Sequence, residues 1–438
     1  MTVLDAKVMI AITASAAIVM AGCGLFFLPG GEDPYQSVLS IGHEGTFENG
    51  IYESVIISPS VGDGHVVLRN ITILVSLVIN GGGSGTVVLE GCDNQGTTTV
   101  DKQGGETVRV YLRGTELASL DASSDLILEA DADSSFGSVN LSNSRAVVQG
   151  SDTSVTSIQM GDGTELDVNG GKVTSVTVPA ECSAILRAGT EGKITAAEVS
   201  GSVTVDGEDT GIDAVSMNDG SSLLVRKGTV NEVTVPAECN ATLQADAGAS
   251  VGTVTVSGSI SVEGSDTFIG NAVLQDGSSV TVVAGTVDNL DIASEKSATV
   301  MTGSEGLVRN ANISGKLTVD GSETRVETVN LDDGSAVDIR EGTVDYVKVP
   351  KDSSVVLDKS DSATVRSAVV GDNVSIDASD DTDLSDVYIS MSEDAKGDVV
   401  KIKDSDYRAR EYRPGSWWDW WNWWNWWDWV FPHGYTFR

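Results

Sequence analysis

Aromatic residues, histidine and cysteine are all scarce in this chain of 438 residues. Phe, Trp and Tyr make up 5% of it, and it has three histidines and four cysteines. So few aromatic residues suit a narrow core filled by Val, Ile, Leu and Ala. The cysteines form no C-x-x-C pair, which excludes the common zinc-site patterns. The 48 glycines show no Gly-X-Y period, which excludes a collagen-like chain.

Basic residues are also few. The chain has 27 Lys and Arg against 64 Asp and Glu, a formal net charge of −37. Such a field disfavours nucleic acid and anionic membrane along the body of the protein, and it favours solubility outside the cell. We therefore expect no nucleic-acid partner. This charge does not define a fold.

An internal repeat of 57 residues runs from about residue 150 to residue 378. Glycines recur at this spacing in three separate phases, so the fold has to be interpreted as a repeat architecture. The three phases are Gly150, Gly207, Gly264 and Gly321; Gly163, Gly220, Gly277 and Gly334; and Gly171, Gly228, Gly285 and Gly342.

Each period divides into three shorter units, as in residues 212–228, 229–249 and 250–268. Each unit has an apolar triplet, then a turn, then an alternating apolar pair. Alternation in runs rich in Val, Ile and Thr predicts strands, and Gly, Ser, Asp and Asn mark the corners. The expected equivalent positions are Val215, Val233 and Val254; Met217, Val235 and Val256; Leu223, Ala241 and Ile260; and Val225, Leu243 and Val262.

A strand pattern that returns about every 19 residues predicts an all-β solenoid. Each unit forms one coil, and equivalent residues stack at about 4.8 Å, the spacing of strands in a sheet. Because no coil buries its apolar side alone, stacking supplies the core. Parallel crossovers are overwhelmingly right-handed, and the GGxGxD signature of calcium β-rolls is absent. We therefore predict a right-handed parallel β-helix with three coils per period.

The first 23 residues contain an export signal. Val8–Met20 is an uncharged apolar stretch, and Val19-Met20-Ala21-Gly22-Cys23 follows it. This sequence resembles the bacterial lipobox, which implies removal of residues 1–22 as a signal peptide and a diacylglycerol anchor on Cys23. The alternative is an uncleaved signal anchor, because Val8–Leu28 is long enough to span a bilayer. Both interpretations predict an exported chain held at a membrane.

The remaining boundaries follow from where the repeat starts and fades. Strand-like runs before the repeat predict less regular coils of the same solenoid, because terminal coils are usually atypical. The expected segments are a tether at 23–40, irregular N-terminal coils at 41–145, regular repeats at 146–403, a linker at 404–416 and a Trp-rich tail at 417–438.

All nine tryptophans lie in the tail. In one interpretation they cap the open end of the apolar column, because the ends of a solenoid must be covered. In the other they contact a membrane interface or a glycan, because Trp prefers bilayer interfaces and its flat ring stacks on sugars. The candidate contacts are Trp417, Trp418, Trp420, Trp421, Trp423, Trp424, Trp426, Trp427 and Trp429.

Catalysis has little support in the sequence. Right-handed β-helices include pectin-lyase-like enzymes, whose hydrolases carry paired aspartates with Gly-His-Gly and Arg-Ile-Lys signatures. This chain has the pairs Asp332-Asp333 and Asp380-Asp381 but neither signature, and its repeat contains no histidine. An Asp precedes Gly in every period, as a turn requires, whereas a catalytic residue occurs once. We expect no catalytic residue, cofactor or metal. A polysaccharide lyase or hydrolase is the alternative.

The valine-rich coils punctuated by Gly and Ser resemble the passenger regions of bacterial surface adhesins. That resemblance covers most of residues 41–403 and implies a non-enzymatic stalk, adhesin or binding scaffold at the cell surface or in the periplasm. The expected partners of such a protein are the membrane, through the lipid on Cys23, and a cell-envelope glycan or a host surface. One further expectation concerns Cys182 and Cys239. They lie three coils apart, about 14 Å, which is too far for a disulfide.

Overall fold

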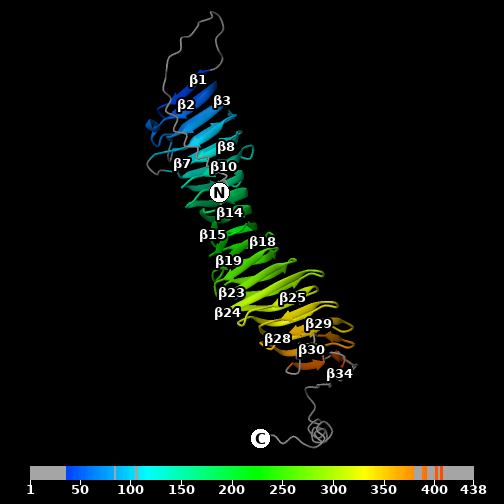
Figure 1. Cartoon of the computed structure of the whole chain (residues 1–438). Helices are drawn as coiled ribbons and strands as arrows, with labels where there is room; N and C mark the ends of the chain where they lie inside the picture. The colour runs from blue at the N-terminus through cyan, green and yellow to red at the C-terminus, as the bar shows by residue number, and fades with distance from the viewer. Residues whose placement is uncertain are drawn as a thin grey trace, which may run out of the picture. The chain divides into compact units, whose positions relative to one another are not determined.

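The computed structural model describes residues 36–82, 85–103, 107–378, 387–391, 400–402 and 405–407. In these residues the regular structure is β-strand apart from one short 3₁₀ turn, η1 (Pro59–Val61). The strands stack in parallel as a β-solenoid of about 17 turns with roughly 20 residues per turn (Figure 1). The predicted all-β parallel helix is therefore confirmed. Its right-handed sense stays a prediction.

Every coil adds one strand segment to each of two ladders of hydrogen-bonded strands. The first, which we call the long ladder, consists mainly of strands of about seven residues. In stacking order its strands are β1 (Gln36–Ile41), β2 (Gly45–Ile57), β3 (Val66–Ile79), β5 (Asp93–Asn94), β6 (Thr97–Val100), β8 (Glu116–Ala122), β10 (Ser135–Leu141), β12 (Ser154–Met160), β13 (Thr164–Val178), β14 (Ser183–Val199), β16 (Gly211–Met217), β18 (Thr229–Val235), β20 (Ser250–Val256), β22 (Phe268–Leu274), β23 (Ser278–Ile292), β24 (Ser297–Ile313), β26 (Arg325–Leu331), β28 (Gly342–Val349), β30 (Ala363–Val370) and β32 (Tyr388–Met391).

The second, the short ladder, begins with the first halves of β2 and β3, and the first halves of β13, β14, β23 and β24 also belong to it. The last strand of the short ladder, β33 (Val400–Ile402), pairs antiparallel with β34 (Ser405–Tyr407). The other pairings among the described residues are parallel. The remaining strands of the short ladder are β4 (Val87–Glu90), β7 (Val108–Arg113), β9 (Leu126–Ala130), β11 (Arg145–Gln149), β15 (Ser202–Val205), β17 (Ser222–Val225), β19 (Asn240–Ala245), β21 (Ser259–Glu263), β25 (Lys316–Val319), β27 (Ala336–Ile339), β29 (Ser354–Lys359) and β31 (Ser375–Asp377).

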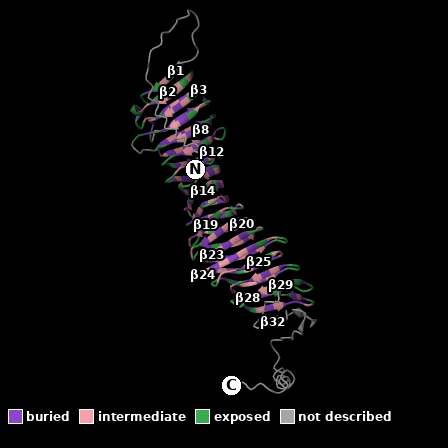
Figure 2. Ribbon diagram, viewed as in Figure 1, coloured by how far each residue is buried: buried purple, intermediate pink, exposed green. Residues whose placement is uncertain are grey.

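The core is one column between the two ladders. In β16 the buried residues are Ile212, Val215 and Met217, which is the predicted apolar triplet. The same triplet recurs along the long ladder, and alternate residues of the short ladder complete the core (Figure 2). Full burial of one such Val, Ile or Leu contributes about 1.5–3 kcal/mol. Stacking therefore supplies the stability that no single coil has.

The long ladder returns to register after one period. Ile212 pairs with Val230, Val230 with Val251, and Val251 with Ile269, which gives steps of 18, 21 and 18 residues. These steps add up to the sequence repeat, so equivalent residues of successive periods lie in one row. The predicted stacking of Val215, Val233 and Val254 is confirmed.

Two predicted equivalences on the short ladder are wrong, Leu223 with Ala241 and Val225 with Leu243. Leu223 pairs with Leu243 rather than with Ala241, and Val225 pairs with Ala245. Strand β19 has three inward residues, so the sequence pattern alone cannot decide which two of them meet β17. A shift by two residues leaves each side chain on the same face of the sheet, so the core pattern is unchanged. The next pairs match the prediction: Ala241 with Ile260, and Leu243 with Val262.

The short ladder consequently drifts by two residues in every period. Leu166 pairs with Leu186, Leu186 with Val205, and Val205 with Val225. The residue one period after Leu166 in the sequence is Leu223, two positions before the residue that stacks there. Since this drift is an even number of residues, inward positions remain inward in every period.

A buried threonine ties each regular period to the preceding coil. The Thr210 hydroxyl accepts the Ala188 N–H at 2.8 Å and donates to the Ala188 carbonyl at 3.3 Å. Gly228 has a φ of 95°, and a Cβ atom there would overlap the Thr210 carbonyl, so only glycine fits. In the other periods a threonine hydroxyl likewise accepts an N–H of the preceding coil, and a glycine lies against the carbonyl of that threonine. These pairs are Thr153 with Gly171, Thr267 with Gly285, and Thr324 with Gly342.

Candidate functional site

Several predicted sites lie outside the described residues and stay predictions. They are the lipidation site Cys23 and the nine tryptophans of the tail; the pair Asp380-Asp381, to which we assign no catalytic role, lies outside as well. Among the residues that are described, no helix is long and apolar enough to cross a membrane. The same residues contain no group of three or more His, Cys, Asp or Glu side chains placed to hold a metal ion.

The recurring Asp-Gly pairs join one coil to the next. The Asp219 carboxylate accepts the Asn240 backbone N–H at 2.9 Å and its side-chain amide at 3.1 Å, while the Gly220 N–H donates to the Asn240 carbonyl at 2.7 Å. These hydrogen bonds, the backbone one above all, hold the pKa of Asp219 below its usual value. The equivalent pairs are Asp162 with Ser183, Asp276 with Ser297, and Asp333 with Ser354.

Two buried carboxylates are each held between two arginines. The Asp167 carboxylate, 5% exposed, accepts Arg145 Nε at 2.6 Å and lies 3.4 Å from Arg187 Nη1. Asp345, 9% exposed, lies 3.4 Å from Arg325 Nη2 and 2.9 Å from Arg366 Nη1. A buried charge is tolerated only when it is paired. These carboxylates therefore link coils and present little negative charge to solvent.

The three described cysteines are free thiols. Cys92 is buried and its Sγ donates to the Leu68 carbonyl at 3.2 Å. Burial raises the pKa of the Cys92 thiol, which keeps it protonated and unreactive. Cys182 and Cys239 are partly exposed and unpaired, in agreement with the predicted coil spacing.

Arg109 and Arg113 both have partners on the short ladder. Arg109 Nε donates to Glu129 Oε2 at 2.9 Å, one coil further along. The Arg113 guanidinium lies 4.8 Å from the centroid of the Tyr111 ring, in a cation–π contact. Both side chains therefore take part in contacts along an outward strand face.

A surface without carboxylates crosses the last described coils of the long ladder. We call it the amide–tyrosine face. It consists of two adjacent rows of outward residues on β24, β26, β28, β30 and β32. One row contains Asn310, Thr328, Tyr346, Ser367 and Tyr388, and the other contains Asn312, Asn330, Lys348, Val369 and Ser390.

The ten positions of this face include no carboxylate and one lysine, in a chain that is strongly acidic as a whole. Tyr346 is 51% exposed and Tyr388 is 61% exposed, with Ser367 between them in the same row. Side-chain amides form a short ladder in the other row. Asn330 Nδ2 donates to Asn312 Oδ1 at 2.8 Å, and Lys348 is the next residue of that row.

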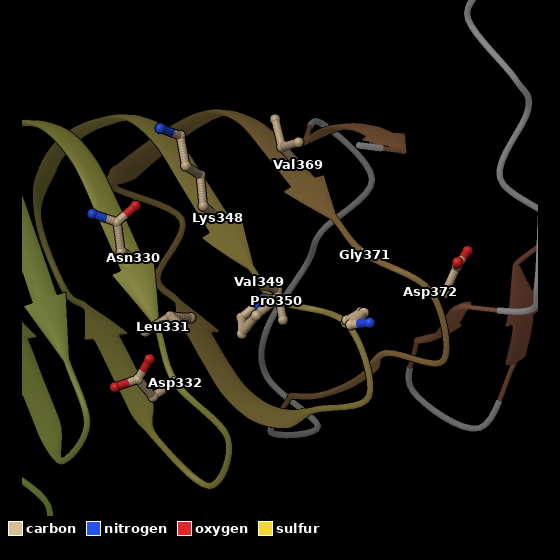
Figure 3. Close-up of a pocket in the computed structure, with 10 residues that line it drawn as sticks. Asn330, Leu331, Asp332, Lys348, Val349, Pro350, Val369, Gly371 and Asp372 are labelled. Carbon is tan, nitrogen blue, oxygen red and sulfur yellow. The ribbon is translucent and has the colours of Figure 1, made fainter. Parts of the chain in front are cut away.

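A hollow adjoins this face where β26, β28 and β30 end. Its volume is about 390 Å³, within the range of small-molecule sites. Asn330, Lys348 and Val369 point to the same side of three successive strands at its edge (Figure 3). The other lining residues are Leu331, Asp332, Val349, Pro350, Lys351, Gly371 and Asp372. The hollow and the amide–tyrosine face together are the candidate binding site.

Comparison of the chain with protein-family models, with curated proteins and with solved structures finds no match.

Two features of the described coils were missed in the sequence. The buried threonine ends each of the segments VQGSDT, VDGEDT, VEGSDT and VDGSET, and its invariable spacing is a signal that would have found it. Tyr346 and Tyr388 lie 42 residues apart, which does not match the period. Their alignment depends on two successive steps of 21 residues between Tyr346, Ser367 and Tyr388.

Proposed function

We propose that this protein is an exported, lipid-anchored β-solenoid that serves as a surface stalk, adhesin or binding scaffold. The observation that carries the proposal is the use of its recurring polar residues. The Asp-Gly carboxylates and the buried threonines of the regular periods form hydrogen bonds from one coil to the next. Residues used in this way build a long rigid column rather than a reaction centre.

The ends of the chain and its charge fit this function. Ala21-Gly22-Cys23 supplies the lipid anchor, and the Trp-rich tail at 417–438 supplies a contact for a membrane or an envelope glycan. The net charge of −37 keeps the column soluble and repels nucleic acid. The partners that we propose are the membrane at the N-terminus and a glycan or host surface elsewhere.

Anchoring is tested by expressing the full chain and its Cys23→Ala variant in bacteria that are fed a fatty-acid probe. We expect the probe to label the parent chain, and the variant to lose both the label and the cleavage of its precursor. Proteolysis of intact cells then reports whether the column is displayed outside. Unchanged processing of the Cys23→Ala variant would exclude the lipobox.

A carbohydrate-active enzyme is the second candidate. The hollow beside Asp332 and Lys348 favours it, because its volume suits a small-molecule site. Incubation of the purified chain with acidic polysaccharides separates the two functions. New unsaturated or reducing ends would indicate a lyase or hydrolase, whereas a scaffold leaves the polymer unchanged.

A further inference from the structure

The amide–tyrosine face has the chemistry of a carbohydrate site. Stacking on a sugar ring requires an exposed, flat aromatic surface, and Tyr346 and Tyr388 are more exposed than most large hydrophobic residues of the chain. Hydroxyl groups require amide, hydroxyl and ammonium partners, which Asn330, Lys348 and Ser390 place in the neighbouring row.

The spacing of the two tyrosines indicates an extended ligand. They are separated by two coil steps, about 9.6 Å at the usual strand spacing, and Ser367 between them is small. This separation is close to the length of two sugar units in an extended β-linked chain. A glycan running along the solenoid would therefore meet one ring at every second sugar.

The charge of the face selects among the possible occupants. The whole chain has a net charge of −37, so a polyanion is repelled from most of its surface. Next to the face, the buried Asp345 carboxylate is paired with both Arg325 and Arg366, and Lys348 is the single charged residue of the two rows. A second protein is disfavoured because Asn, Thr and Ser interrupt any continuous apolar area.

We infer that the amide–tyrosine face binds an extended, uncharged β-linked glycan, with sugar rings stacked on Tyr346 and Tyr388. Asn330 and Lys348 donate hydrogen bonds to its hydroxyl oxygens, and the adjoining hollow accepts a substituent of the sugar. This inference rests on the proposed scaffold function and specifies the class of its ligand.

The test is calorimetric titration of the full chain, in detergent, with cellohexaose and with chitohexaose. We expect binding of at least one of them, weakened about tenfold or more in the double variant Tyr346→Ala/Tyr388→Ala, because both stacking surfaces are lost. The matched control is Phe268→Ala, which removes an aromatic residue that is 41% exposed on β22, outside the face. It should bind as the parent chain does.

The hexasaccharide that binds identifies the kind of glycan, since chitohexaose carries N-acetyl groups and cellohexaose does not. Equal affinity of the parent chain and the double variant would overturn the inference, as would binding of single-stranded DNA at this face. If the parent chain binds neither hexasaccharide but binds envelope fractions, the glycan site is overturned and the scaffold function stands. If the parent chain binds neither the hexasaccharides nor the envelope fractions, the scaffold function is contradicted as well.

Discussion

The hydroxyl of Thr267 accepts the backbone N–H of Ala245 at 2.9 Å, and its single proton faces two carbonyl oxygens, that of Ala245 at 3.0 Å and the nearer one of Glu263. Thr267 and Ala245 are both buried, and they lie one coil apart. This side chain thus gives the buried Ala245 N–H a partner and also binds a carbonyl, where the corner interrupts the short ladder. Buried backbone groups without a partner are costly, so this pairing fixes the geometry of the corner.

Thr267→Val should destabilise this corner, because valine has the shape of threonine but leaves the Ala245 amide without a partner. The expected cost is about 1–3 kcal/mol. Hydrogen exchange measured by mass spectrometry should show faster exchange in the peptide that contains Ala245. Thr267→Ser keeps the hydroxyl and should retain most of the protection. Equal protection in the parent chain and the valine variant would show that the hydroxyl has no such role.

Val233→Asp should disrupt several coils. Val233 is fully buried and stacks between Val215 and Val254, so the substitution places an unpaired charge in the column. That costs several kcal/mol, and stacking transmits the damage to neighbouring coils. Thr234→Asp, on the outward side of the same strand, is the matched control. Melting followed by circular dichroism should shift strongly for the first variant and little for the second.

Acid should weaken the Asp-Gly corners. Hydrogen bonds from the next coil lower the pKa of Asp162, Asp219 and Asp276 in the folded protein. A lowered folded pKa gives a contribution that is present above the unfolded value, about 4, and is lost as the pH falls through the folded value. We expect the melting temperature of the parent chain to fall more steeply with acid than that of a triple Asn variant.

The control for this comparison is Asp266→Asn, which removes one charge from an exposed turn. The melting temperature of this variant should fall with acid as steeply as that of the parent chain. The substitution relieves some overall repulsion but leaves the three Asp-Gly corners intact. A triple Asn variant whose melting temperature falls as steeply as that of the parent would contradict the role of these carboxylates.

Truncation at Pro414 tests the Trp-rich tail. Nine clustered tryptophans exceed what one coil end requires for its cover, and an apolar cluster of this kind marks an interaction surface. We therefore expect a truncated chain that melts as the full chain does and binds envelope fractions less. The opposite result, a lower melting temperature with unchanged binding, would indicate that the tail caps the open end of the column.

The sequence predicts the long ladder well and the short ladder less well, and the physical reason lies in β19. Every strand of the long ladder in the regular repeats has an uneven triplet of inward residues, so Val215, Val233 and Val254 align in one way only. The alternating inward residues of β19 fit their neighbours equally well after a shift by two. The geometry of the corner decides between these two registers, and the pattern of apolar residues does not determine that geometry.

The candidate site was less predictable than the fold. Tyr346 and Tyr388 lie in one row, two coils apart, because two steps of 21 residues follow each other near the end of the column, where the periodicity is fading. The absence of carboxylates from their face is a property of stacked rows rather than of any run of sequence. It becomes visible only when the register of every coil is known.

The even drift of the short ladder bears on how such a chain changes its length. A duplicated or deleted period meets its neighbours through the same contacts as before, because one ladder returns to register and the other moves by two residues without exchanging its faces. One coil alone lacks this property, since successive steps differ in size. The length of the solenoid therefore varies in increments of three coils, about 14 Å each.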